Sequence, residues 1–106
     1  MHKEIDVKEL ARWRSEGKAF VLLDVREPRE WATAALPDTL QISMREIALR
    51  ISELPKDAKI AVICHLGGRS ERVAQFLTTQ GYADVSNVDG GIDAYAREID
   101  AAIPLY

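Results

Sequence analysis

Cys64, the one cysteine of the 106-residue chain, is the residue whose type and setting best suit covalent chemistry. It follows a short apolar run at residues 59–63 and precedes Gly67, Gly68 and Arg69. A thiolate is a strong nucleophile, and a cysteine that ends a buried strand lies at the edge of an α/β sheet where ligands bind. This stretch therefore predicts a nucleophilic cysteine on a strand–loop–helix unit.

The residues after Cys64 are able to form an anion-binding loop. Gly67 and Gly68 let the backbone curl without Cβ clashes, so that successive N–H groups point inward. A helix expected at 70–80 adds its N-terminal N–H groups, and Arg69 adds a positive charge. Together these groups favour the thiolate. A lone cysteine is more often a small buried residue that ends a strand, but the Gly-Gly-Arg-Ser continuation argues against that interpretation.

The elements that must position this loop alternate between strand and helix patterns, which predicts an α/β fold with a largely parallel sheet. Continuous apolar runs indicate buried strands, and apolar residues spaced three and four apart indicate helices. Strands are expected at 20–25, 40–42, 59–63 and 85–88. Helices are expected between Asp6 and Gly17 and at 28–31, 44–54, 70–80 and 90–99.

Composition is typical of a small globular domain, expected to span residues 1–106. Apolar residues make up 47% of the chain, charged residues 29%, and the net charge is -3. No basic excess suggests a nucleic-acid or membrane-surface partner, and no stretch approaches the roughly 20 apolar residues of a membrane span. One cysteine excludes an intramolecular disulfide and a zinc site built on several thiolates. It suits a reducing compartment, so a cytoplasmic location is expected.

Three motifs, in this order, resemble those of rhodanese domains. They are Leu-Leu-Asp-Val-Arg-Glu-Pro at 22–28, Cys-His-Leu-Gly-Gly-Arg-Ser at 64–70 and Val-Asp-Gly-Gly-Ile at 88–92. The resemblance covers residues 5–106. It implies a three-layer α/β fold with about five mainly parallel strands in the order 3-2-4-5-1 and helices on both faces. That order would place Asp24, at the end of strand 2, beside Cys64, at the end of strand 4.

The resemblance also implies sulfur transfer through a persulfide on Cys64, with no metal and no organic cofactor. The donor would be thiosulfate or a protein or low-molecular-weight persulfide, and the acceptor would be cyanide, a thiol or a protein. Two further residues, Asp24 and Arg26, would help to order the loop. The persulfide anion would be bound by the loop residues His65, Leu66, Gly67, Gly68, Arg69 and Ser70.

Two other functions are open to a chain of this kind. A rhodanese module that only binds a partner would have no need of Cys64 and Arg69. A phosphatase or arsenate reductase of the same fold is disfavoured, because the loop from Cys64 to Arg69 spans six positions and the phosphatase branch has one more. His65 and Leu66 stand where some thiosulfate-using members carry basic residues, which weakens the case for thiosulfate as the natural donor.

Two segments need separate interpretation. Residues 34–39 replace the Gly-His-Ile-Pro-Gly-Ala frequent in the family, so the resemblance leaves their conformation open. Residues 98–106 resemble the ends of rhodanese domains fused to enzymes that activate ubiquitin-like sulfur carriers. A ubiquitin-like sulfur-carrier protein or its activating enzyme is therefore one expected partner. In a compatible interpretation, Ile103, Leu105 and Tyr106 fasten the C-terminus to the body of the domain.

Overall fold

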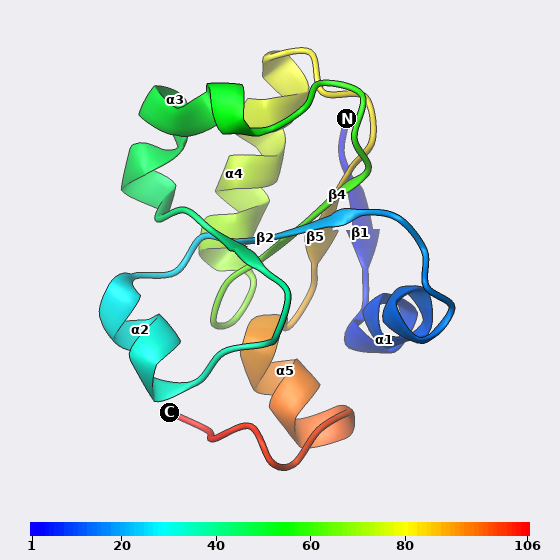
Figure 1. Cartoon of the computed structure of the whole chain (residues 1–106), viewed down its shortest axis with the longest axis vertical. Coiled ribbons are helices and arrows are strands. Elements are labelled where there is room, and N and C mark those ends of the chain that lie inside the picture. Colours follow the sequence, from blue (N-terminus) through cyan, green and yellow to red (C-terminus); the bar gives the residue numbers. More distant parts are fainter.

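Five parallel strands form one sheet in the order β1-β5-β4-β2-β3 (Figure 1). The computed structural model describes all 106 residues. This is the strand order that the rhodanese resemblance implies, read from the other edge, so the predicted topology is confirmed. The strands are β1 (Lys3–Ile5), β2 (Val21–Asp24), β3 (Leu40–Gln41), β4 (Ile60–Ile63) and β5 (Val85–Val88).

β1 is the strand that the residue pattern does not indicate. Its three residues, Lys-Glu-Ile, are mostly exposed and carry no apolar run. It forms because it adds to the edge of the sheet, where Lys3 to Ile5 pair with Ser86 to Val88 of β5. Pairing with a buried neighbour, rather than local propensity, makes this segment a strand.

The register of the central strands brings the functional segments together. All four residues of β4 are buried between β2 and β5. Asp24, the last residue of β2, is paired with Ile63, the last residue of β4. Because parallel strands end at the same edge, Cys64 and Arg26 both leave the sheet there.

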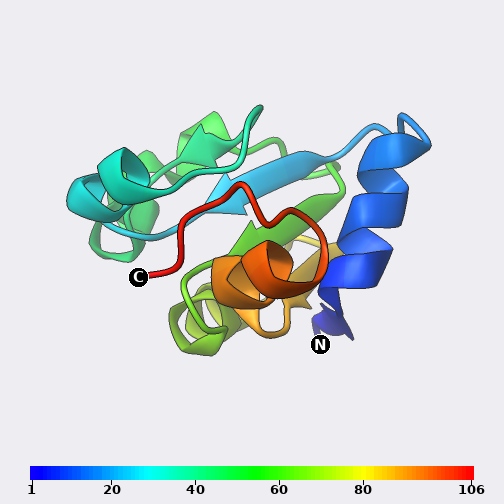
Figure 2. The same cartoon turned by 90° about the horizontal axis from the view of Figure 1, so that it is seen from below.

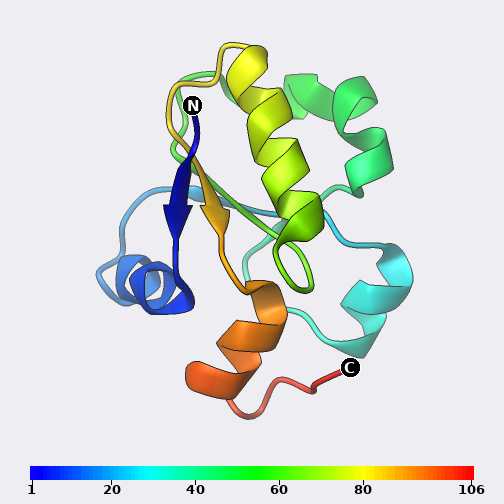
Figure 3. The same cartoon turned by 180° about the vertical axis from the view of Figure 1, so that it is seen from behind.

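Helices cover both faces of the sheet, as predicted. Alternate residues of β4 face opposite sides: Ala61 and Ile63 belong to one apolar cluster, Ile60 and Val62 to the other. The first cluster is closed by α1 (Val7–Ser15) and α5 (Gly91–Glu98). The second is closed by α3 (Ile47–Arg50) and α4 (Gly68–Thr79), which lie side by side (Figure 3). None of these helices is long and apolar enough to cross a membrane.

Two helix predictions need correction. The helix expected at 44–54 is three short pieces, the 3₁₀ turn η1 (Met44–Glu46), α3 and the 3₁₀ turn η2 (Ile51–Glu53). Its end is tightened because the Tyr82 hydroxyl reaches the carbonyl oxygens of Ile51 and Leu54, at 3.1 and 2.7 Å, and replaces part of the helical hydrogen bonding. The helix expected at 70–80 begins at Gly68, so Arg69 lies in its first turn.

Arg26 is a fully buried cation that ties two other segments to the end of β2. Its exposed fraction is 0%, and it pairs with Asp24 through an Nη2–Oδ2 contact of 2.8 Å. Its guanidinium also donates to the Ala34 carbonyl and to the Tyr106 hydroxyl, each at 2.8 Å. Burial opposes the charge, but the hydrogen bonds to Asp24 and Tyr106 prevail and raise the pKa of Arg26 above its ordinary value. Arg26 thus anchors the start of segment 34–39, whose conformation the resemblance left open.

We predict that Asp24→Asn destabilises the protein by about 3–5 kcal/mol, because it leaves the buried Arg26 charge uncompensated. Urea denaturation measures the loss. The matched control is the double variant Asp24→Asn/Arg26→Met, compared with Arg26→Met alone. If the pair acts as one unit, the double variant is more stable than the two single losses predict. Strictly additive losses would contradict this account.

Candidate active site

Cys64 lies directly after β4 with its sulfur beneath the loop that follows. Its exposed fraction is 1%. The Gly67 N–H donates to Sγ at 3.1 Å, and the Ser70 Oγ lies 3.3 Å from Sγ. The Ser70 hydroxyl also lies 3.2 Å from the Gly67 carbonyl oxygen, so its single proton serves one acceptor at a time. The sulfur therefore has two hydrogen-bond donors near it, one from the loop and one from the first turn of α4.

Gly67 gives the loop its tight bend. It is the N-cap of α4 and has a φ of +113°, a left-handed conformation that glycine adopts without strain. A Cβ here would lie 3.3 Å from the Gly90 nitrogen. The bend aims the N-terminus of α4, with its unpaired N–H groups and positive dipole end, at Cys64. The left-handed bend at Gly67 and the helix that follows it are the local geometry that the sequence predicts for this loop.

The N-terminus of α5 holds the other side of the loop. The Ile92 and Asp93 N–H groups donate to the carbonyl oxygens of Cys64 and His65, at 2.9 and 3.1 Å. Gly91 permits this approach: a Cβ there would lie 2.5 Å from the Cys64 carbonyl oxygen and closer still to that of His65. The motif at residues 88–92 therefore fixes the backbone of Cys64 and His65 through the N-terminus of α5.

Arg69 is paired with a carboxylate, a contact that the sequence analysis did not anticipate. Its Nη1 and Nη2 donate to Oε1 and Oε2 of Glu30 at 2.6 and 2.9 Å, a bidentate pair. Glu30 belongs to α2 (Pro28–Thr33), far from Arg69 in the sequence. The hydrogen bond from Arg69 is the main reason that the pKa of Glu30 falls to about 2.

Glu30 is a site residue that the sequence analysis missed. It stands at the third position of α2, where its Oε1 accepts from the Glu27 N–H at 3.0 Å in a capping box. The signal available in the sequence was Pro28 followed by Glu30, which is typical of a helix start. Nothing in that pattern indicates a partner in another motif.

Tyr106 was expected only to fasten the C-terminus, and it reaches the site itself. The segment after α5 runs across to α2, where the chain ends (Figure 2). The Tyr106 hydroxyl donates to Glu30 Oε2 and accepts from Arg26 Nη1, both at 2.8 Å. Its ring stacks on His65, with centroids 4.0 Å apart and planes 10° apart. A continuous chain of polar contacts thus runs Asp24, Arg26, Tyr106, Glu30, Arg69.

The other predicted loop and tail residues differ in burial. His65 is half-buried under Tyr106, and its Nε2 is buried without a hydrogen-bond partner. Leu66 is 63% exposed and forms the outer surface of the loop. Ile103 is buried in the first apolar cluster, whereas Leu105 is exposed. The tail is therefore fastened by Ile103 and Tyr106, and Leu105 takes no part.

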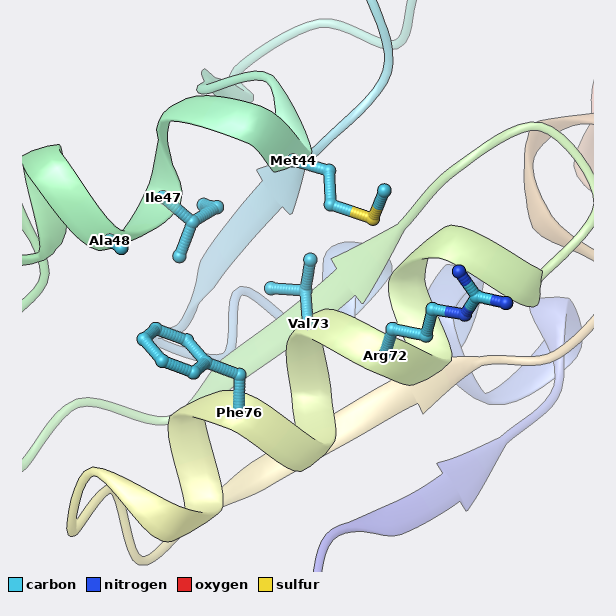
Figure 4. Close-up of a pocket in the computed structure, with 6 residues that line it drawn as sticks. All are labelled: Met44, Ile47, Ala48, Arg72, Val73 and Phe76. Atoms are coloured by element: carbon cyan, nitrogen blue, oxygen red, sulfur yellow. The ribbon is translucent and has the colours of Figure 1, made fainter.

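None of the three cavities of the molecule is lined by Cys64. An apolar pocket of about 190 Å³ lies between η1–α3 and α4 (Figure 4). In it, Met44 and Ile47 face Val73 and Phe76, with Ala48 and Arg72 completing the lining. The buried sulfur of Cys64 therefore does not open into any of these cavities.

One group of side chains has the composition of a metal site, and it does not include Cys64. His2 Nε2 lies 3.0 Å from Glu4 Oε2 and 2.9 Å from Glu71 Oε1. Asn87 donates to both carboxylates. The two glutamates are mutually hydrogen-bonded, which raises the pKa of Glu71. His2 and both carboxylates thus have polar partners within the protein, whereas the buried Asn87 Oδ1 has none.

The fold and the loop together define a class of protein: an open parallel α/β domain with a buried thiol at the carboxyl end of a central strand. The rhodanese-like domain family matches residues 6–98. The chain is 40% identical over 97 residues to a sulfurtransferase of Allochromatium vinosum, covering 92% of this chain and 91% of that protein. It is 33% identical over 93 residues to thiosulfate sulfurtransferase GlpE of Pseudomonas syringae, covering 88% and 86%.

Solved structures agree with these matches. A rhodanese-like domain protein from Staphylococcus aureus superposes with a TM-score of 0.85 at 29% identity, covering 98% of each chain.

A longer relative, adenylyltransferase and sulfurtransferase MOCS3 of Arabidopsis thaliana, is 27% identical over 118 residues, and the match covers 96% of this chain but 25% of that protein. The chain belongs to the rhodanese-like domain family, and sulfur transfer is the general kind of reaction that its relatives support.

We predict that Gly91→Ala disables sulfur transfer, because a Cβ at this position pushes the Cys64–His65 peptide away from α5. Gly17→Ala is the matched control. Gly17 also has a left-handed φ, but nothing lies within 4 Å of its added Cβ. The control should lose about 1–2 kcal/mol of stability from backbone strain and keep its activity. Urea denaturation and a sulfur-transfer assay measure both effects, and equal activity in the two variants would refute the assigned role of Gly91.

Proposed function

We propose that this protein moves sulfane sulfur from a donor to a thiophilic acceptor through a persulfide on Cys64. One observation carries the proposal: the Cys64 sulfur lies at the N-terminus of α4 and accepts from the Gly67 amide, in a chain whose close relatives are named sulfurtransferases. Helix N-termini and loop N–H groups favour the thiolate and stabilise an anion attached to it.

The reaction is a pair of nucleophilic substitutions at sulfur. The Cys64 thiolate attacks the outer sulfur of the donor, a new S–S bond forms, and the donor's bond to that sulfur breaks. The electron pair leaves with the donor, as sulfite from thiosulfate or as a thiolate from a persulfide. The acceptor then attacks the outer sulfur of the Cys64 persulfide, and Sγ leaves as the thiolate. The exchange itself calls for no metal or organic cofactor.

The residues around the sulfur divide this work. The Gly67 N–H and the Ser70 hydroxyl hold Sγ before reaction. The backbone N–H groups of the loop would then receive the outer sulfur of the persulfide. The Asp24–Arg26 pair supports the loop indirectly, because Arg26 holds Tyr106 and Tyr106 packs on His65.

We also propose the classes of molecule that donate and accept the sulfur. Thiosulfate is supported by the name of the Pseudomonas relative, and a protein or low-molecular-weight persulfide serves the same mechanism. Cyanide, a thiol or a protein would accept the sulfur. A ubiquitin-like sulfur carrier or its activating enzyme is supported by the resemblance of residues 98–106 and by the match to MOCS3. The single free cysteine fits a cytoplasmic location.

We predict that Cys64 gains one sulfur atom when the protein meets an alkyl persulfide or thiosulfate. Intact-protein mass spectrometry measures the gain, and added cyanide should remove it as thiocyanate. Cys64→Ala should neither gain sulfur nor turn over, because no other thiol exists in the chain. Circular dichroism controls for folding. A folded Cys64→Ala protein that still transfers sulfur would refute the proposal, and an unreactive wild type would favour a module that only binds a partner.

We predict negligible hydrolysis of an aryl phosphate by the same preparation. The buried Sγ is enclosed by a six-position loop, and Arg69, which a phosphatase would need for the phosphate, is occupied by Glu30. The assay is run beside sulfur transfer on one sample, with arsenate reduction as a third measurement. Phosphate hydrolysis faster than sulfur transfer would reverse the assignment within the same fold.

A further inference from the structure

The two arginines that enter the sulfur site are both paired with carboxylates. Arg26 is paired with Asp24, and both side chains are buried. Arg69 is paired with Glu30 through two hydrogen bonds. These four side chains contribute no net charge. The positive field left at Cys64 is that of the α4 N-terminus and the loop N–H groups, roughly half an elementary charge.

Glu30 is built into this position. Besides Arg69, its carboxylate accepts from the Tyr106 hydroxyl at 2.8 Å and from the Glu27 N–H at 3.0 Å. Its side chain is 11% exposed, so water competes little for these bonds. With a pKa of about 2, Glu30 stays ionised at every pH at which the protein would work. Its negative charge is therefore a permanent feature of the site.

We propose that Glu30 is a specificity-determining residue that directs the site toward persulfide donors and away from dianionic donors such as thiosulfate, by neutralising Arg69. This inference rests on the proposed sulfur transfer and names the donor class of the same site. Thiosulfate and the Cys64 thiolate together bring three negative charges, whereas a persulfide on a neutral alkyl group, with its ionisable S–S–H, brings at most two with the thiolate. The first combination therefore gains more from a free arginine, because charges in a poorly solvated site interact strongly.

The test compares two donors on Glu30→Gln. Glutamine keeps the size of the side chain and an oxygen for Arg69 and for the Glu27 N–H, but it removes the charge. The measured quantity is the second-order rate of Cys64 persulfide formation, followed in single turnovers by mass spectrometry without any acceptor. The probes are thiosulfate, a dianion, and a persulfide whose alkyl group carries no charge. The ratio of the thiosulfate rate to the persulfide rate should rise about tenfold, equivalent to about 1.4 kcal/mol.

Two matched variants separate charge from disruption. Glu53→Gln makes the same change in another bidentate pair, that of Glu53 with Arg50 on the α3–η2 segment, and should leave both rates unchanged. Tyr106→Phe removes one hydrogen bond to Glu30, but the Glu30 carboxylate keeps its negative charge. The donor ratio of this variant should therefore stay within about twofold of wild type, well below the tenfold change expected for Glu30→Gln. A binding measurement adds an independent readout. Thiosulfate should bind more tightly to Cys64→Ser/Glu30→Gln than to Cys64→Ser, which cannot react.

The outcomes distinguish this inference from the function on which it rests. If wild-type protein forms a persulfide with neither donor, the proposed function fails. If it reacts but Glu30→Gln leaves the donor ratio and the thiosulfate affinity unchanged, Glu30 does not set donor choice. A Tyr106→Phe ratio that rises as much as that of Glu30→Gln would assign the effect to loop disruption and overturn the charge argument.

Discussion

The geometry of the sulfur site depends on one backbone contact, the packing of the Cys64–His65 peptide against the N-terminus of α5. The Ile92 and Asp93 N–H groups hold the two carbonyl oxygens from one side, and Gly91 leaves the space in which they lie. With the peptide fixed there, the chain must turn back sharply, and Gly67 supplies the left-handed residue for that turn. The turn starts α4 at Gly68, with the helix N-terminus beside Cys64. The strand order places Cys64 at the carboxyl edge of the sheet, and the bend at Gly67 brings the positive end of the α4 dipole to its sulfur.

A second constraint is the compensation of charge around that sulfur. Arg26 lies too deep to remain unpaired, and Asp24 and Tyr106 satisfy it. Tyr106 then contacts Glu30, and Glu30 holds Arg69. This chain of contacts joins β2, α2, the C-terminal residue and the start of α4. The same contacts that stabilise the fold at its carboxyl edge leave Arg69 paired, so the proposed control of donor choice would use side chains that also stabilise the fold.

The local parts of this site could be predicted from the sequence, and the long-range pairs could not. Residues 59–70 carry strand, glycine and helix signals in direct succession, so the position of Cys64 and the bend at Gly67 follow from nearby residues. The partnership of Glu30 with Arg69 joins residues 39 positions apart, and that of Glu30 with Tyr106 joins residues 76 apart. A capping glutamate and a terminal tyrosine have ordinary local roles that conceal these contacts. β1 is a strand only because β5 lies beside it.

The most direct test of the central claim, that the loop between Cys64 and Arg69 is a cradle for a persulfide, is a crystal structure of the protein after reaction with a stoichiometric alkyl persulfide. The account predicts one additional sulfur bonded to Cys64 Sγ and hydrogen-bonded to inward N–H groups of the loop, with the Arg69–Glu30 pair and the α5 contacts retained. An outer sulfur directed away from the loop N–H groups, or a loop that must unfold to hold it, would contradict the account.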